Sequence, residues 1–579
     1  MNRLYRRIAK TSILSQTSSG ERIFNAMLRL LPYQVLGSLS TVVLLLVDGL
    51  VVGNYLGADA LSSVNLISPL TTFMGAFCSV VGSGISIALT QAMVSSDRDA
   101  VRRIYKAAFY LTIATVVVII AVEIPVASLI IGSYHLSGHH LHMVWSYSYG
   151  VLFALVVSAI STVGTYVLAS IGEAKKLAML TIVETLVNLF FDVFLVVFCQ
   201  VGVGGAGYGT AIACSVRAIL TIILVLKKIN LFPLIEGSCL HDMVKITSLG
   251  SYQLYSNTML FLKNYFVNLL IMRSIHSDGF AAYSVACFAI TIVNSLANAM
   301  NQTTAPFNGM LTGIGDWSGG TRLLRKTLVS VFVAMTALTT IIFLAPRTLF
   351  YIYTIDNVSR MQLNVVRIIA LMLPALAMNK ILQNYMTYCH MKRYATVASA
   401  LQFVVIMLPL SVLLCRFTTL GVFISFVVTN ILVFILTLAV YEFKIRQIMA
   451  DEKCLDSLSL TIEKSQAADF SQQLHDFFMN IYGDQALANK VSVCAEEASA
   501  YLESGSYKTA TIDILLSAFK DHINLFVLNS EKDETYLDEL IDDENVPILN
   551  NYFIMRKLAS EYSYHNICGL NSYTLVFKL

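Results

Sequence analysis

Three polar residues recur every four positions inside one long apolar segment of the chain. Glu184, Asn188 and Asp192 lie in AMLTIVETLVNLFFDVFLVVF, and this spacing places them on one face of a helix. A carboxylate inside a lipid-spanning helix costs roughly 2.5–3.5 kcal/mol on insertion scales. This face should therefore look onto a water-filled cavity, a partner helix or a bound cation, and away from lipid.

Two further residues could complete such a site. Asp48 lies within the apolar run LSTVVLLLVDGLVVGNYL, and Thr210 follows the Gly-rich turn VGVGGAGYG. Hard cations such as Na⁺ bind to carboxylate, amide and hydroxyl oxygens, and a carboxylate removed from water can hold a proton near neutral pH. Asp48, Asn188, Asp192 and Thr210 could supply either kind of site.

The composition indicates which elements position these residues. Of the 579 residues, 56% are hydrophobic and only 13% are charged, with a mean hydropathy of +0.69. The charges are sparse up to about residue 440 and dense after it. This pattern predicts a polytopic, all-α membrane region followed by a soluble domain. The net charge of +3 gives nucleic-acid binding no electrostatic support, and the ten cysteines contain no CxxC pair, so no metal site is expected.

Apolar runs of about 20 residues predict about twelve membrane spans. Their centres lie near residues 40, 77, 118, 156, 188, 218, 262, 295, 340, 375, 404 and 431. The short connections alternate between loops rich in Lys and Arg, such as 98–106, and loops with none, such as 201–207. The positive-inside rule then places the basic loops and both termini in the cytoplasm.

The chain also resembles itself at an offset of about 220 residues. GADALSSVNLISPLTTFMGAF (57–77) is similar to DGFAAYSVACFAITIVNSLAN (278–298), and a basic stretch follows each. Two pseudo-symmetric lobes of six helices are therefore expected, with the transport path between them. The expected domains are a cytoplasmic N-terminus (1–22), an N-lobe (23–230), a C-lobe (231–448) and a cytoplasmic tail (449–579).

Several motifs together resemble the multidrug and toxic compound extrusion (MATE) transporters. They are VDGLVVGNYLGADALSSVNLISPL (47–70), GSGISIALTQAM (82–93) and VNLFFDVFLVVFCQVGVGGAGYGTAIA (187–213). The resemblance covers roughly residues 20–445. It implies a twelve-helix antiporter that exports organic, typically cationic, molecules in exchange for Na⁺ or protons.

The resemblance also assigns roles to individual residues. It implies that Asp48, Asn188, Asp192 and Thr210 form the cation and proton site of the N-lobe. Tyr147 stands where the family often has a tyrosine facing this pocket. Glu184 is not part of the family pattern and is a further candidate for coupling.

The expected C-lobe spans carry asparagines and no mid-span carboxylate, which concentrates coupling in the N-lobe. Asn294, Asn298 and Asn301 share one face of a helix and are candidates for contacting substrate. Hydrogen bonding between helices is the alternative for these amides. Lys263 and Lys380 are long enough to reach the membrane surface, and a role in substrate binding is the second possibility for both.

The tail alternates between strand and helix patterns in the order β-α-α-β-β-α-β, which predicts a two-layer α/β sandwich. ANKVSVCAEEASAY (488–501) resembles the first ATP motif of histidine-kinase and anti-sigma-factor ATPase domains, with Glu497 at its acidic position. Tyr501 replaces the metal-chelating Asn, and the Gly-rich motifs are missing. A regulatory or protein-binding module is therefore expected, and no enzyme.

Three functions remain in competition. A cation-coupled exporter in the cytoplasmic membrane is favoured. A lipid-linked precursor flippase of the same superfamily would need a basic central cavity, which the sequence does not reveal. A membrane sensor kinase would need an intact nucleotide site, and the tail motifs lack one.

Overall fold

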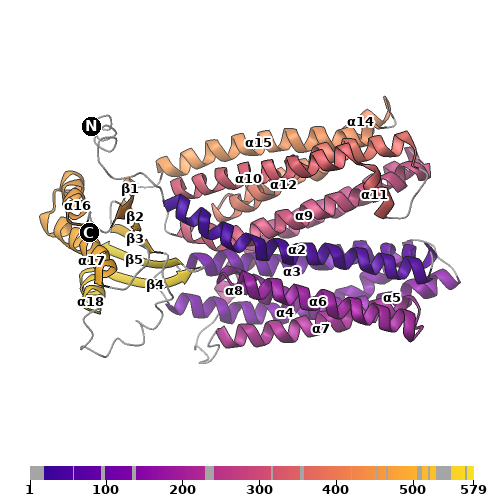
Figure 1. Ribbon diagram of the computed structural model, residues 1–579, viewed down its shortest axis with the longest axis horizontal. Coiled ribbons are helices and arrows are strands. Elements are labelled where there is room, and N and C mark those ends of the chain that lie inside the picture. The colour runs from indigo at the N-terminus through magenta and orange to yellow at the C-terminus, as the bar shows by residue number, and fades with distance from the viewer. Residues whose placement is uncertain are drawn as a thin grey trace.

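The computed structural model contains a long helical region and a small α/β domain at one end of it (Figure 1). Lipid offers no partner to backbone N–H and C=O groups, so long apolar segments form helices that satisfy these groups internally. The structure describes residues 19–56, 58–92, 98–133, 138–228, 240–274, 276–313, 317–352, 358–418, 420–451, 454–463, 467–504, 511–519, 522–529, 549–567 and 570–578.

The first half of the helical region holds six successive helical segments. They are α2 (Ser19–Leu56), α3 (Ala58–Ala92), α4 (Arg98–Ser133), α5 (His139–Ser170), α6 (Ala174–Asp192) and α7 (Val203–Lys228). α6 continues directly into a π-helix, η1 (Val193–Phe198). Such π segments are frequent at functional sites.

The second half repeats this order. Its helices are α8 (Leu240–Ser274), α9 (His276–Gly313), α10 (Trp317–Leu344), α12 (Arg360–Tyr388), α13 (Lys392–Ala400) with η2 (Leu401–Val405) and α14 (Met407–Cys415), and α15 (Gly421–Asp451). A short helix, α11 (Arg347–Ile352), precedes α12. Ser359 caps α12, because its Oγ accepts a hydrogen bond from the backbone N–H of Gln362 at 3.2 Å.

Corresponding helices of the two halves begin 218 to 221 positions apart, as with Ser19 and Leu240 or Val203 and Gly421. This agrees with the offset of about 220 seen in the sequence. Each of the twelve expected span centres lies within an α- or π-helix. Among the described residues, nine segments are long and apolar enough to cross a membrane, and α2, α8 and α9 are not among them. The number of twelve spans therefore stays a prediction.

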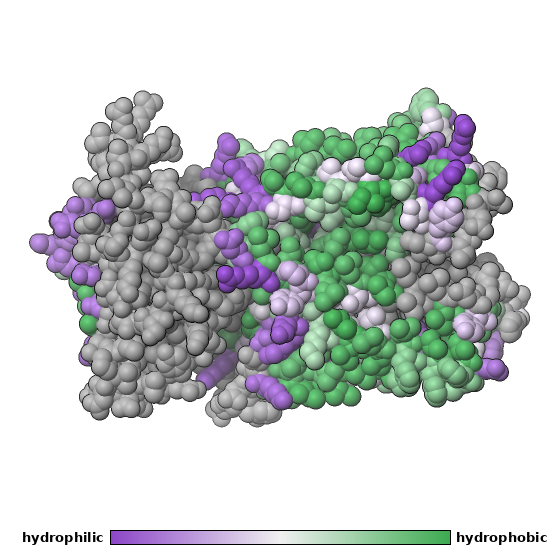
Figure 2. Space-filling view, in the orientation of Figure 1, coloured by the Kyte–Doolittle hydropathy of each residue, from purple (hydrophilic) through white to green (hydrophobic). Residues whose placement is uncertain are grey.

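The outer surface of the helical region is apolar. Figure 2 shows hydrophobic side chains over its length and polar ones gathered toward its two ends. Large apolar side chains stand fully out from the bundle, with Leu129, Phe198 and Leu344 each 75% exposed. A water-soluble protein rarely exposes so large a continuous apolar area, so this belt is the surface that lipid covers.

The two lobes meet in the half of the bundle that carries the basic loops. Asn257 of α8 donates a hydrogen bond to Ser79 Oγ of α3 at 3.1 Å, and Gln91 Nε2 donates to the Tyr388 carbonyl at 3.4 Å. The α3 and α8 backbones approach so closely that a Cβ on Gly84 or Gly250 would collide with the opposing helix. Tight packing of small residues is how helices associate in membranes.

The tail is a five-stranded antiparallel sheet with three helices, ordered β1-β2-β3-β5-β4. Its elements are β1 (Cys454–Glu463), α16 (Ala467–Tyr482), α17 (Gln485–Ser504), β2 (Thr511–Phe519), β3 (His522–Asn529), α18 (Leu549–Leu558), β4 (Glu561–Ile567) and β5 (Leu570–Lys578). Two layers are present as expected. The last helix, expected over residues 550–563, ends at Leu558, and EYSYHNI forms an additional strand, β4, that was not predicted.

One face of the tail sheet packs on its own helices and the other turns toward the membrane helices. Leu525 and Val527 of β3 lie in the tail core with Phe478 and Val491. Side chains alternate along a strand, so Phe526 points the opposite way. It is buried in the core of the C-lobe instead. The tail is therefore packed onto the helical region and is not a loosely tethered module.

The nucleotide motifs of the tail can be tested directly. We expect the purified full-length protein to show no Mg²⁺-dependent ATP binding in the micromolar range by calorimetry. Tyr501 replaces the amide that would chelate the metal, and backbone amides approach phosphates closely only where side chains do not intrude. Micromolar binding that disappears with EDTA would contradict this expectation.

Candidate cation-coupling site and polar cavity

Asn188 and Asp192 lie one turn apart on α6, and both are fully buried. Asn188 Nδ2 donates a hydrogen bond to Asp192 Oδ2 at 3.3 Å. α7 covers the carboxylate at Gly209, whose missing side chain leaves room for Asp192 Oδ1. Asp192 is also the last residue of α6 before the π-helix η1 begins. A buried carboxylate and amide at a helix irregularity can bind a proton or a small hard cation.

The helices that carry the other expected ligands converge on the same place. Val52 of α2, Val196 of η1 and Ala206 of α7 belong to one buried cluster. Each lies four residues from an expected ligand: Val52 follows Asp48, Val196 follows Asp192, and Ala206 precedes Thr210. Residues four apart share a helix face. The fold therefore brings the four positions into one layer, while the Asp48 side chain lies outside the described residues.

Thr210 and Tyr147 line the edge of this layer. The Thr210 hydroxyl donates to the carbonyl of Ala206 on its own helix at 3.1 Å, which leaves its lone pairs able to accept or to coordinate. Tyr147 is half-buried and packs on the cluster that contains Val52 and Val196. A Cβ on Gly207 would collide with the Tyr147 carbonyl, so α5 and α7 are in close contact here.

Glu184 lies two turns from Asp192, and it is paired. Arg217 of α7 forms an ion pair with it through Nη1 and Oε2, and Arg217 Nη2 also donates to Thr165 of α5 at 3.2 Å. The side chains of Glu184 and Arg217 are 13% and 19% exposed. This arrangement joins α5, α6 and α7, which is what a structural ion pair does. Sequence reasoning missed Arg217, although a basic residue in a membrane helix is itself a signal.

The ion pair makes a stability prediction. We expect Glu184→Gln alone to lower the melting temperature in detergent by several degrees, because Arg217 would remain charged without its partner; breaking a buried pair costs about 3–5 kcal/mol. The double variant Glu184→Gln/Arg217→Gln should recover most of the loss. If the double variant is as unstable as the single one, the two residues do not act as a pair.

The sequence reasoning also missed one carboxylate in a membrane helix. Glu123 lies in α4, within the apolar run IIAVEIPVASLI, and is 6% exposed. Among the described residues, its Oε2 has no hydrogen-bond partner. Asp48 and Asp192 were identified as carboxylates inside long apolar segments, and Glu123 meets the same criterion. Glu123 is therefore a further candidate for proton binding.

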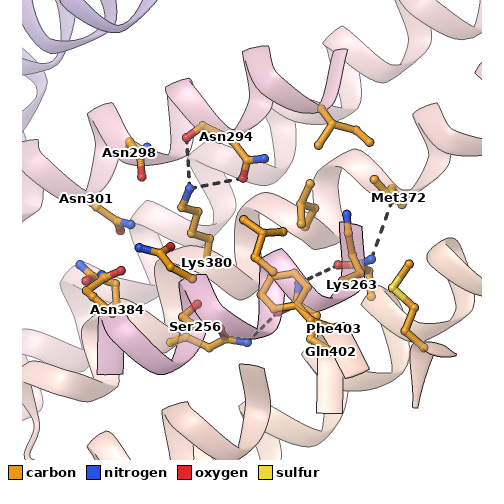
Figure 3. Close-up of a pocket in the computed structure, with 18 of the residues that line it drawn as sticks. Ser256, Lys263, Asn294, Asn298, Asn301, Met372, Lys380, Asn384, Gln402 and Phe403 are labelled. Carbon is orange, nitrogen blue, oxygen red and sulfur yellow. Dashed lines mark hydrogen bonds between the residues drawn. The ribbon is translucent and has the colours of Figure 1, made fainter. Parts of the chain in front are cut away.

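The C-lobe contains a cavity that is lined largely by polar side chains (Figure 3). Asn294, Asn298 and Asn301 of α9 line it along one face, and their contact with substrate stays a prediction. Lys263 of α8 and Lys380 of α12 also line it. Lys263 is only 8% exposed.

A hydrogen-bonded amide network forms the wall behind this cavity. Gln383 Nε2 donates to Gln402 Oε1 at 2.9 Å, and Gln402 Nε2 donates to Asn430 Oδ1 at 2.8 Å. Tyr252 Oη and Ser399 Oγ both donate to Gln383 Oε1, at 3.0 and 2.9 Å. Amides that satisfy one another in this way fix the shape of the wall. Gln402 belongs to η2, the counterpart of η1 beside Asp192.

Comparison with known proteins agrees with this architecture. The model of the MatE family matches residues 34–194. A probable multidrug resistance protein NorM from Halalkalibacterium halodurans is 27% identical over 153 residues, which are 25% of this chain and 33% of that protein. The alignment therefore spans about a third of the length of this relative.

Solved structures resemble nearly the whole membrane region. A multidrug resistance MATE family transporter of the MOP superfamily in an outward-facing conformation gives a TM-score of 0.69 at 17% identity. It aligns with 75% of this chain and 100% of its own. A mutant of the Vibrio cholerae MATE transporter VcmN also gives 0.69 at 17% identity, covering 74% of this chain and 98% of its own.

Proposed function

We propose that this chain, whose membrane region resembles the MATE family of transporters, is a cation-coupled antiporter that exports small organic molecules. The observation that carries the proposal is the buried Asn188–Asp192 pair beside Gly209. A buried charge is costly in a membrane, so a carboxylate kept there needs a proton or a cation to neutralise it. Binding and release of that ion can then alter how α2, α6 and α7 pack.

The contacts between the lobes support an alternating-access cycle. Ser79, Gln91 and Tyr388 connect the lobes at the end that carries the basic loops. If that end faces the cytoplasm, as the positive-inside rule predicts, this structure is the form that is closed to the cytoplasm. Export requires this closed contact to open and re-form, which a cation achieves only by binding the two forms with different affinity.

We further propose that both termini are cytoplasmic and that the tail regulates transport. Phe526 of β3 reaches the core of the C-lobe, so a protein that binds the tail could act on the packing of the lobes. This is a role in regulation and needs no catalytic activity of the tail.

Reconstitution tests the transport proposal. Purified protein in proteoliposomes should move organic probes against their gradient when a Na⁺ or a pH gradient is imposed, and an ionophore that dissipates that gradient should stop the movement. Liposomes without protein are the control. Probe movement that is insensitive to both gradients would rule out cation coupling.

A further inference from the structure

We propose that the C-lobe cavity binds an organic anion through Lys263 and Lys380, the class of substrate that the transporter proposed above would carry. Both ammonium groups line the same cavity. Twenty of the residues that the structure describes line it, and none of these twenty is Asp or Glu. The cavity therefore holds two basic side chains whose charge no lining carboxylate balances.

Acidic residues in the C-lobe helices lie far from this cavity. In α8, α9, α10, α12 to α14 and α15, the sequence contains only Asp242, Asp278, Glu442 and Asp451. Asp278 is sixteen residues before Asn294 on α9, which is about 24 Å along a helix. Glu442 pairs with Arg325 at 2.8 Å, and Asp242 lies 3.9 Å from Arg103. The lobe thus has no mid-membrane counter-charge for either lysine.

The ammonium groups of the two lysines have hydrogen-bonding capacity left for a ligand. Lys380 Nζ donates to the Asn294 side-chain and main-chain oxygens at 3.3 and 3.5 Å, which are long contacts (Figure 3). Within the described part of the chain, Lys263 Nζ makes no hydrogen bond, and its ammonium lies 5.8 Å from the Phe426 ring centre. An ammonium has three donors, so each of these lysines can donate to a carboxylate, sulfonate or phosphate that enters the cavity.

The other residues that line the cavity indicate the chemistry of the rest of the ligand. Apolar side chains border the same space, and they are Leu260, Ile290, Met372, Leu376, Phe403, Met407 and Phe426. Small-molecule sites combine apolar side chains with a few placed polar groups. This lining fits a molecule with one anionic group and an apolar or aromatic body.

The cavity also reaches the contact between the lobes. Asn257 lines it and donates to Ser79 of α3 across that contact. A ligand held by Lys263 and Lys380 would therefore lie beside the surface that opens and closes. The family resemblance implied a cationic substrate, and the charge of this cavity argues for the opposite sign.

Equilibrium binding to the purified full-length protein tests the inference without any ion gradient. We expect naphthalene-2-sulfonate to bind by calorimetry in a neutral detergent, and trimethyl(2-naphthyl)ammonium, with the same rings, to bind at least tenfold more weakly. Lys263→Gln and Lys380→Gln should each weaken sulfonate binding about tenfold or more. Lys380→Arg, which keeps the charge, should weaken it less than Lys380→Gln. Lys227→Gln, an exposed lysine at the end of α7, is the matched control and should bind as the wild type does.

Competition identifies the source of the anion. The competitor is short-chain phosphatidic acid, and the two dissociation constants are compared. If phosphatidic acid binds more tightly than the sulfonate does, the natural ligand is a lipid headgroup. If it binds more weakly, the natural ligand is a soluble organic anion. Tighter binding of the cationic probe, or wild-type sulfonate binding by both Lys→Gln variants, would overturn the inference. Sulfonate binding without gradient-driven transport would instead refute the proposed coupling and leave this site standing.

Discussion

Replacing Asp192 with asparagine should reduce gradient-driven transport to the level of liposomes without protein, while the protein still folds. Asparagine has nearly the same shape, and its side-chain oxygen can still accept the hydrogen bond from Asn188 Nδ2. The missing side chain of Gly209 leaves room for a side chain of this size. The variant therefore removes the charge and little else, so the loss of transport would report on ion binding.

The measurement is probe flux in proteoliposomes under the gradient that drives the wild type, with melting temperature in detergent as the test of folding. Glu442→Gln is the matched control, because it is the same change of carboxyl to amide in a pair with Arg325 at the surface. It should transport within about twofold of the wild type, since exposed ion pairs contribute only about 0–1 kcal/mol. Wild-type flux from Asp192→Asn would move the coupling site elsewhere, with Glu123 and Asp48 the next residues to replace.

The distinction between coupling and structural support decides how other variants should behave. Replacing a residue that only joins helices lowers the stability of the protein. Replacing its partner as well restores most of that stability, as expected for Glu184 and Arg217. A residue that binds the driving ion affects the dependence of flux on the gradient, and no second substitution nearby restores it. Asp192 is predicted to belong to the second class, because the ion itself is its partner for part of the cycle.

Much of the helical architecture could be predicted from the sequence. Apolar runs are long, the repeat offset of about 220 residues is regular, and spacing alone places Asn188 and Asp192 on one face. These are local properties of a helix in lipid, and they do not depend on which helices are neighbours. The same holds for Asn294, Asn298 and Asn301, which the structure places in one cavity as their spacing suggested.

Properties that depend on packing could not be predicted in the same way. Lys263 and Lys380 are 117 positions apart, and nothing local indicates that α8 and α12 bring both into one cavity. The partnership of Glu184 with Arg217 likewise requires α6 and α7 to pack at one particular rotation. In the tail, β4 is a seven-residue strand that pairs with β5. Its sequence pattern alone does not reveal a strand, because the pairing with β5 is what stabilises it.

A larger side chain at the contact between α3 and α8 should shift the protein toward the form that is open at this end. Gly250 of α8 faces Val80 and Gly84 of α3, and a Cβ at Gly250 would collide with the Val80 carbonyl. Gly250→Val therefore cannot be accommodated unless α3 and α8 separate. Overpacking costs about 1–3 kcal/mol. Because the two helices belong to different lobes, that cost falls on the closed form alone and shifts the population about 5- to 150-fold toward the form open at this end.

Cross-linking measures this shift. Ser79 and Asn257, which are hydrogen-bonded at 3.1 Å, can be replaced by cysteines in a background without the native cysteines. We expect oxidant to join them efficiently in the parent protein and much less in the Gly250→Val variant. Gly75→Val on α3 is the control, because a Cβ there meets nothing within 4 Å. Equal cross-linking in Gly250→Val and Gly75→Val would mean that α3 and α8 do not separate there. The lobes would then have to open elsewhere, because a contact that a wedge cannot open is part of a rigid body and cannot act as a gate.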